Sequence, residues 1–225
     1  MLGVPTEKVP RGEIQGPALG LDVVVLRADG TEADPLEDGE LVCRTPFPTV
    51  PLGFWGDDNR SKIQAAYFDR FEGIWAHGDH ARITATGGFE ILGRLDATLN
   101  SKGVRIGTAE IYRVVLTIKG ITGALAVAQP AGNDTKVALF VVCEGELTAD
   151  LEQEIRSTLR SQASPRHVPD VIAKAPDLPR TRNGKLNELA VSDIVSAKPE
   201  RDSSTLANPE SLEFFRTWTK QNPAS

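Results

Sequence analysis

Short apolar runs separated by turn residues dominate the first 95 positions of the chain. Residues 22–27 and 40–45 are rich in β-branched side chains and predict strands, and Asp29-Gly30 predicts a turn after the first of them. Between residues 74 and 100, apolar stretches alternate with turns at the spacing of a hairpin or meander. Residues 45–58 combine prolines and glycines with aromatics and predict an ordered loop packed on a core. This part of the chain is therefore predicted to be β-rich.

The pattern changes after Gly93, where apolar positions begin to recur at helical spacing. One predicted helical face carries Ile111, Val114, Val115 and Ile118. Thr148 can cap a second helix, in which apolar residues recur every four positions. Strands are predicted over residues 124–128, 136–143 and 168–173, and a short helix over 186–195. This succession of helices and strands is that of a compact α+β domain.

These patterns predict an α+β protein whose internal boundary lies near residues 94–96. Residues 1–95 form the β-rich part and residues 96–197 the α+β domain, while residues 198–225 form a polar tail broken at two prolines. A short docking helix is predicted in the tail from its apolar residues Leu212, Phe214, Phe215 and Trp218.

Composition narrows the classes of function. The 25 basic and 31 acidic residues give a net charge of -6, which disfavours nucleic-acid binding but still allows a small anionic ligand. No apolar run is long enough to cross a bilayer, and the first residues lack the order of a signal peptide. Cys43 and Cys143 lie in apolar runs, where cysteine is usually a small core residue. We expect a cytoplasmic protein with neither a disulfide scaffold nor a zinc site.

Three stretches carry candidate chemistry. Asp79, beside a glycine at a strand end, can accept two hydrogen bonds from a ribose diol, or it is simply a turn residue. Arg94, Lys102 and Arg105 lie among glycines before a helix, which suits either a phosphate site or a solvated turn. Lys185 follows a proline-led segment with a flexible Asn-Gly tip, and its ammonium either reaches a phosphate or carboxylate or faces solvent.

The histidines indicate no metal site. His77 and His80 are three residues apart, but no third ligand follows at a recognisable spacing, and His167 is interpreted as structural. The chain also contains no Walker loop, no Gly-x-Gly-x-x-Gly and no Gly-x-Ser-x-Gly sequence.

In order and spacing, these stretches resemble the C-terminal part of the adenylate-forming acyl-CoA synthetase superfamily. The most specific match is the long central motif Gly103-Val104-Arg105-Ile106-Gly107-Thr108-Ala109-Glu110-Ile111-Tyr112. Further matching segments are residues 11–15, 39–43, 46–48, 53–55, 66–68, 96–100, 166–169, 183–185 and, in the tail, 208–212. Within the superfamily, the subfamily that activates acetoacetate is the most similar, and the resemblance covers nearly the whole chain.

The resemblance implies a ligase with two half-reactions. Such enzymes join a carboxylate to the α-phosphate of ATP, supplied with Mg²⁺, and release pyrophosphate; they then transfer the acyl group to the thiol of coenzyme A. Lys185 matches the lysine that stabilises the adenylation transition state. Asp79 matches the acid that holds the ribose hydroxyls, and Arg94 matches a second ribose or phosphate contact.

The resemblance also implies that the small domain moves between the two half-reactions. Asp96 falls at the hinge about which this domain rotates. Gly103 would then flank the pantetheine channel, and Arg105 and Arg160 are candidates for contacts with the coenzyme A phosphates.

The chain departs from this superfamily in extent. Family members begin with a large domain whose Ser/Thr/Gly-rich loop cradles the ATP phosphates, and no such loop occurs here. We therefore expect the β-rich end of the large adenylating domain followed by the small mobile α+β domain. Three possibilities stay open: part of a longer or split ligase, a non-catalytic nucleotide- or coenzyme A-binding remnant, and a truncated reading frame. We also expect apolar surface around residues 46–55 that contacts a separate large-domain chain or a second copy.

Overall fold

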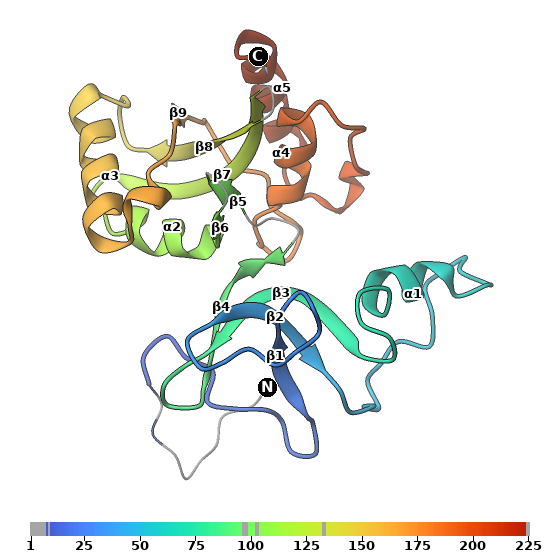
Figure 1. The fold of residues 1–225 in the computed structure, drawn as a ribbon. Coiled ribbons are helices and arrows are strands. Elements are labelled where there is room, and N and C mark those ends of the chain that lie inside the picture. The colour runs from blue at the N-terminus through green and yellow to red at the C-terminus, as the bar shows by residue number, and fades with distance from the viewer. Residues whose placement is uncertain (1–7, 9, 96–98, 102–103, 132–133, 224–225) are drawn as a thin grey trace. The chain divides into compact units, whose positions relative to one another are not determined.

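The computed structural model describes residues 8, 10–95, 99–101, 104–131 and 134–223 (Figure 1). The chain divides into two compact units, Met1–Leu95 and Asp96–Ser225. The first unit is mostly β-sheet, whereas the second combines helices with sheet, which confirms the predicted α+β class. In the described parts of the chain, no helix has the length and apolar composition that crossing a membrane requires.

A four-stranded antiparallel sheet forms the centre of the first unit. Its strands follow one another in sequence order: β1 (Val23–Leu26), β2 (Asp38–Cys43), β3 (Trp75–Ile83) and β4 (Phe89–Arg94). Side chains alternate between its faces, so that one face packs Val25, Leu41 and Phe89 while the other packs Val24, Val42 and Phe71. The predicted strands over 22–27 and 40–45 and the predicted meander are thus confirmed, with ends shifted by one or two residues.

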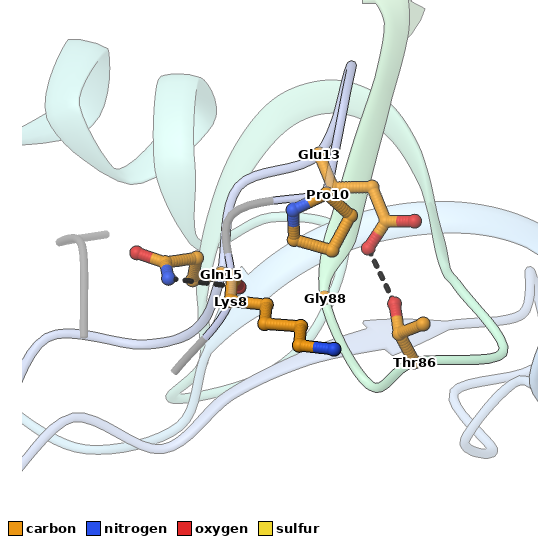
Figure 2. A pocket seen from close by; sticks show the side chains of 6 residues that line it. All are labelled: Lys8, Pro10, Glu13, Gln15, Thr86 and Gly88. Atoms are coloured by element: carbon orange, nitrogen blue, oxygen red, sulfur yellow. Dashed lines mark hydrogen bonds between the residues drawn. The ribbon is translucent and has the colours of Figure 1, made fainter. Parts of the chain in front are cut away.

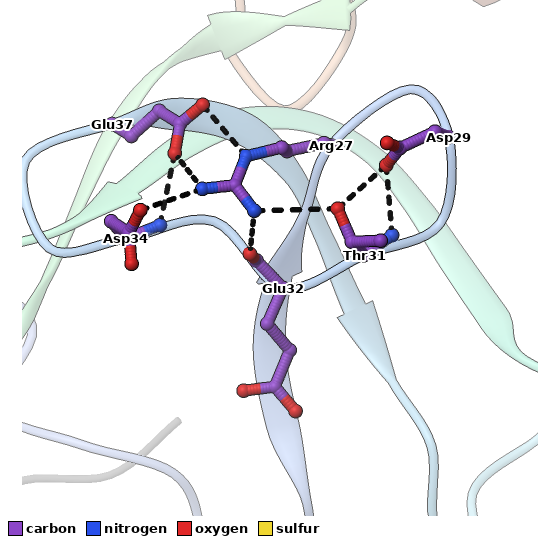
Figure 3. A network of polar contacts seen from close by, with 6 residues as sticks. All are labelled: Arg27, Asp29, Thr31, Glu32, Asp34 and Glu37. Atoms are coloured by element: carbon purple, nitrogen blue, oxygen red, sulfur yellow. Dashed lines mark hydrogen bonds and ion pairs between the residues drawn. The ribbon is translucent and has the colours of Figure 1, made fainter.

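The connection between β1 and β2 is held by one arginine. The guanidinium of Arg27 donates to Glu37 at 2.8 Å, to Asp34 at 2.8 Å and to the hydroxyl of Thr31 at 3.3 Å (Figure 3). Asp29 in turn accepts from the backbone N–H of Thr31 at 3.0 Å, which stabilises the predicted turn. The positive charge of Arg27 is therefore paired with the carboxylates of Asp34 and Glu37 within the loop.

The long connection between β2 and β3 is partly packed and partly exposed. Phe47 packs on the sheet and meets the ring of Trp75 edge-on at 5.4 Å, as predicted for a loop packed on a core. The tip of this connection is not packed on the sheet, because the side chains of Leu52 and Trp55 are 94% and 101% exposed. Helix α1 (Ser61–Tyr67) follows, and the sequence pattern did not predict it. The carboxylate of Asp57 stabilises its first turn by accepting hydrogen bonds from two backbone N–H groups, both at 2.9 Å.

The second unit is built on a three-stranded sheet with helices on both faces. Its strands are β7 (Ile121–Ala131), β8 (Asp134–Cys143) and β9 (Val171–Lys174), in the order β7-β8-β9. One face packs against α2 (Thr108–Val115) and α3 (Ala149–Gln162), and the other against α4 (Glu188–Val195) and α5 (Leu212–Gln221) (Figure 1). Alternate residues of β7 and β8 serve the two cores, which explains why both strands read as continuous apolar runs.

Most predicted elements of this unit are present. Thr148 caps α3 by accepting from the backbone N–H of Leu151 at 3.3 Å, as predicted. The strand predicted over 168–173 begins only at Val171, because Pro169 has no N–H for a ladder. A hairpin of β5 (Leu99–Ser101) and β6 (Val104–Ile106) precedes α2, in a stretch interpreted from sequence only as a glycine-rich phosphate site or turn.

The predicted docking helix of the tail is α5, and it completes one core of the second unit. The ring of Phe140 on β8 meets Phe215 at 4.9 Å and Trp218 at 4.8 Å, both edge-on. Leu212, Phe215 and Trp218 are buried in this cluster. The polar tail therefore ends in a helix that is part of the folded unit.

Candidate functional site

Asp79 and Arg94 face each other across two neighbouring strands of the first unit. Asp79 lies in β3, directly opposite Arg94 of β4, and beside a register shift between His80 and Ala81. Nη1 of Arg94 lies 3.2 Å from Oδ1 of Asp79 and donates to the backbone carbonyl of His77 at 2.9 Å. Asp79 is therefore neither a turn residue nor at a strand end, as the sequence had suggested, because β3 continues through it from Trp75 to Ile83.

A glycine makes this arrangement possible. Gly78 has φ of 71°, and a Cβ at this position would lie 2.8 Å from Nη2 of Arg94. Only glycine adopts this backbone conformation without strain while leaving room for the guanidinium. The ion pair itself is half exposed, so it contributes little to stability. The ion pair instead fixes the positions of the two side chains, so that a carboxylate and a cation lie side by side.

A cavity of about 470 Å³ opens beside Asp79 within the first unit. Most of its lining is apolar, and the lining residues are Ile14, Leu21, Val23, Leu41, Cys43, Phe47, Thr49, His77, Asp79 and Ile91. Nδ1 of His77 lies 3.2 Å from the carbonyl oxygen of Leu41, and burial lowers the pKa of His77, so the ring is neutral near pH 7. An apolar cavity with a carboxylate at its edge suits a nucleoside, whose base needs flat apolar surface and whose diol needs an acceptor.

A second cavity of about 290 Å³ lies elsewhere in the first unit (Figure 2). Its lining includes Lys8, and Glu13, whose carboxylate accepts from the hydroxyls of Thr84 at 2.8 Å and Thr86 at 2.5 Å. None of the predicted site residues that the structure describes lines this cavity.

Lys185 lies in a tight hairpin of the second unit, which we call the lysine hairpin (residues 178–187). The backbone N–H of Gly184 donates to the carbonyl of Thr181 at 2.7 Å, and the N–H of Thr181 donates to the carbonyl of Lys185 at 2.8 Å. Gly184 has φ of 78°, so the chain makes a turn followed by a left-handed residue. Lys185 is therefore the first residue after the turn, directly before the bridge between Leu186 and Arg180, and it is exposed.

Of the remaining predicted site residues, two lie in described elements of the second unit and two do not. Arg160 lies exposed in the last turn of α3. Arg105 lies in β6 opposite Asn100 of β5. Asp96 and Gly103 fall outside the described residues. Asp79 and Arg94 thus come together in the first unit, whereas Lys185, Arg105 and Arg160 belong to the second.

Two polar contacts of the second unit were missed by sequence reasoning. The hydroxyl of Tyr112 on α2 donates to Glu188 at the start of α4 and accepts from the backbone N–H of Ala126 at 2.9 Å. Burial raises the pKa of Tyr112 well above its ordinary value, and the negative charge of Glu188 adds to the effect. Tyr112 and Glu188 are 76 positions apart, and no local signal in the sequence links them.

His167 has the structural role predicted for it. Its Nδ1 lies 2.8 Å from the hydroxyl oxygen of Ser164, and its Nε2 lies 3.1 Å from Oε2 of Glu110. The ring thereby ties the 3₁₀ turn at Pro165–His167 to the first turn of α2. Within the parts of the chain that the structure describes, no group of three or more His, Cys, Asp or Glu residues could hold a metal ion.

Comparison with known proteins gives consistent matches. Residues 110–185 match the family described as the AMP-binding enzyme C-terminal domain. Acetoacetyl-coenzyme A synthetase of Rhizobium meliloti (strain 1021) is 50% identical over 217 residues, which are 96% of this chain and 33% of that protein. Acetoacetyl-CoA synthetase of Caenorhabditis elegans is 45% identical over 219 residues, covering 95% of this chain and 31% of that protein.

A solved structure supports the same relationship. Acetoacetyl-CoA synthetase from Streptomyces lividans superimposes with a TM-score of 0.85 at 33% identity, covering 94% of this chain and 32% of that one. The chain thus spans about a third of the length of the curated relatives it matches.

Proposed function

This chain is homologous to the C-terminal third of acetoacetyl-CoA synthetases, and from that premise we propose that it carries the mobile-domain half of an ATP-dependent acetoacetate–CoA ligase. The lysine hairpin is the observation that carries the proposal. It presents Lys185 on an ordered turn at the end of the segment that matches the AMP-binding enzyme C-terminal domain.

Adenylation needs a cation where charge accumulates. A carboxylate oxygen of acetoacetate forms a bond to the α-phosphorus of ATP, which enters with Mg²⁺, as the bond to pyrophosphate breaks. Negative charge builds up on the oxygens around phosphorus, and the ammonium of Lys185 stabilises it. Asp79 accepts hydrogen bonds from the ribose hydroxyls, while Arg94 holds Asp79 in place and adds a positive charge beside it.

Thioester formation uses a different face of the second unit. The sulfur of coenzyme A forms a bond to the acyl carbon, AMP leaves, and the thiol proton passes to solvent. The small domain rotates about Asp96, so that the face around Gly103 replaces the lysine hairpin at the active site. Arg105 and Arg160 then contact the coenzyme A phosphates. The use of ATP and coenzyme A fits a cytoplasmic enzyme.

The phosphate cradle and most of the carboxylate pocket would come from a large-domain chain. The exposed Leu52 and Trp55 offer apolar surface to that partner, with a second copy of this chain as the alternative occupant. Positioning of reactants is worth roughly 7–11 kcal/mol, most of which is lost without the cradle and the pocket. We therefore expect no ATP–pyrophosphate exchange with acetoacetate by the 225-residue chain alone.

Reconstitution tests the proposal. Adding a separately expressed large-domain fragment of the Rhizobium meliloti relative should restore exchange. In the reconstituted ligase, Lys185→Ala should slow adenylation by ~10²–10³-fold and spare thioester formation from supplied acetoacetyl-adenylate. Lys119→Ala, at an exposed position of the same unit, is the matched control.

Other outcomes separate the alternatives. Binding of nucleotide or coenzyme A by the chain, without exchange after reconstitution, would favour a non-catalytic binding module. Equal loss of both half-reactions in Lys185→Ala would contradict the assigned role of this lysine.

A further inference from the structure

The tail pairs with the lysine hairpin through one antiparallel β-bridge, directly after a 3₁₀ turn at Ser203–Thr205. Thr181 pairs antiparallel with Leu206, on the edge away from the returning strand at Leu186. The backbone N–H of Arg182 donates to the carbonyl of Thr205 at 3.2 Å, and the N–H of Ala207 donates to the carbonyl of Arg180 at 2.8 Å. The strand that leads into the turn is thus held on both edges.

Asn208 secures this pairing with its side-chain amide. Its Oδ1 accepts from the backbone N–H of Arg180 at 2.9 Å. Its Nδ2 donates to Oδ2 of Asp177 at 2.6 Å and to the carbonyl of Leu178 at 3.0 Å. One amide therefore makes three hydrogen bonds at the base of the hairpin, to Asp177, Leu178 and Arg180, and glutamine is the only other uncharged side chain that could donate two and accept one there.

Apolar packing fixes the tail to the core of the unit. Leu206 and Leu178 are both buried in the cluster formed by α4, α5 and β8. The backbone carbonyl of Asn208 accepts from the hydroxyl of Ser211 at 2.7 Å, just before α5 begins. The position of the lysine hairpin therefore depends on whether α5 and the segment before it are docked.

We propose that residues 203–208 act as a clamp that holds the lysine hairpin, and that Asn208 is a positioning residue for Lys185. An isolated two-stranded hairpin is marginally stable in water, whereas backbone pairing on its second edge and a buried anchor stabilise it. Catalysis by an ammonium requires that it be held where charge develops. The inference rests on the proposed function for its catalytic part, while the clamp itself is a property of this chain.

The test exchanges the hydrogen-bonding groups at the clamp. Asn208→Asp keeps the acceptor for Arg180 but removes both donated bonds and places a carboxylate against Asp177. Backbone amide hydrogen exchange at residues 180–184 should become about 10- to 100-fold faster, because two or more hydrogen bonds are lost. Exchange in β8 should stay unchanged. Gln153→Glu, the same amide-to-acid change at an exposed site on α3, is the control.

A reciprocal exchange distinguishes positioning from general damage. Adding Asp177→Asn to Asn208→Asp restores a donor opposite the new carboxylate, so the double variant should recover most of the slow exchange. In the reconstituted ligase, Asn208→Asp should lower kcat for adenylation by about tenfold or more with KM for ATP nearly unchanged, and the double variant should recover it. If Asn208→Asp unfolds the unit, Asn208→Ala gives the same comparison without the added charge.

Each failure has its own meaning. Unchanged hairpin exchange in Asn208→Asp would overturn the clamp. Faster exchange with unaltered adenylation would overturn the positioning role. Lack of adenylation by the reconstituted wild type would refute the proposed function and the positioning role with it, and the exchange data would still decide whether the clamp exists.

Discussion

Removing one hydroxyl, in Tyr112→Phe, should destabilise the second unit substantially. β7 lies at one edge of its sheet, and the Tyr112 hydroxyl accepts from the N–H of Ala126 on that strand at 2.9 Å. The same hydroxyl donates to the carboxylate of Glu188. A hydrogen bond to a charged group contributes about 1.5–3 kcal/mol, and an orphaned buried N–H costs about 1–3 kcal/mol. Because the two effects overlap, we expect a loss of about 2–4 kcal/mol in the free energy of unfolding.

The measurement is the free energy of unfolding of the second unit in urea, with amide hydrogen exchange in β8 as the reporter of that unit. Ser157→Ala is the control, because it removes an exposed hydroxyl from α3 of the same unit. That control should change the free energy of unfolding by less than about 0.5 kcal/mol. A Tyr112→Phe protein within about 0.5 kcal/mol of the wild type would show that the hydroxyl contacts do not stabilise the fold.

The raised pKa of Tyr112 adds a pH dependence with a definite sign. The folded state favours the neutral phenol, so this stabilisation is fully present below the unfolded pKa of about 10 and is lost as the pH rises above it. The wild type should therefore lose stability more steeply than Tyr112→Phe above about pH 10.

Three further predictions concern the first unit. Gly39→Ala should destabilise it by several kcal/mol, because a Cβ there would lie 2.4 Å from a backbone carbonyl oxygen of β1, whereas Gly53→Ala should be nearly neutral in the same urea titration. Gly78→Ala should cost about 1–2 kcal/mol and displace the guanidinium of Arg94, so any nucleotide binding measured by calorimetry should weaken. Because burial lowers the pKa of His77, its contribution to stability is present above about pH 6.5 and is lost as the pH falls; the urea midpoint should fall from pH 7 to 5, and less so in His77→Gln.

Local patterns in the sequence predicted most elements and the motif residues. Alternating and helical spacings depend only on residues a few positions apart, and these placed the strands of the first sheet and the cap at Thr148. The turn that presents Lys185 is also local, because Gly184 supplies the left-handed conformation that the turn needs. The motifs that carried the family resemblance are likewise short segments whose residue types can be read without a fold.

The tertiary structure decided how distant segments complete these local features. Asp79 meets Arg94 only because β3 and β4 pair with a shifted register. The exposure of Trp55 agrees with the apolar surface expected around residues 46–55, but only the fold separates the buried side chains of this loop from the exposed ones, because burial depends on what lies opposite a side chain. The pairing of Asn208 with the lysine hairpin joins residues about thirty positions apart, and no propensity encodes such a hydrogen bond. Its geometry exists only once α5 has docked in the core and brought the tail beside the turn.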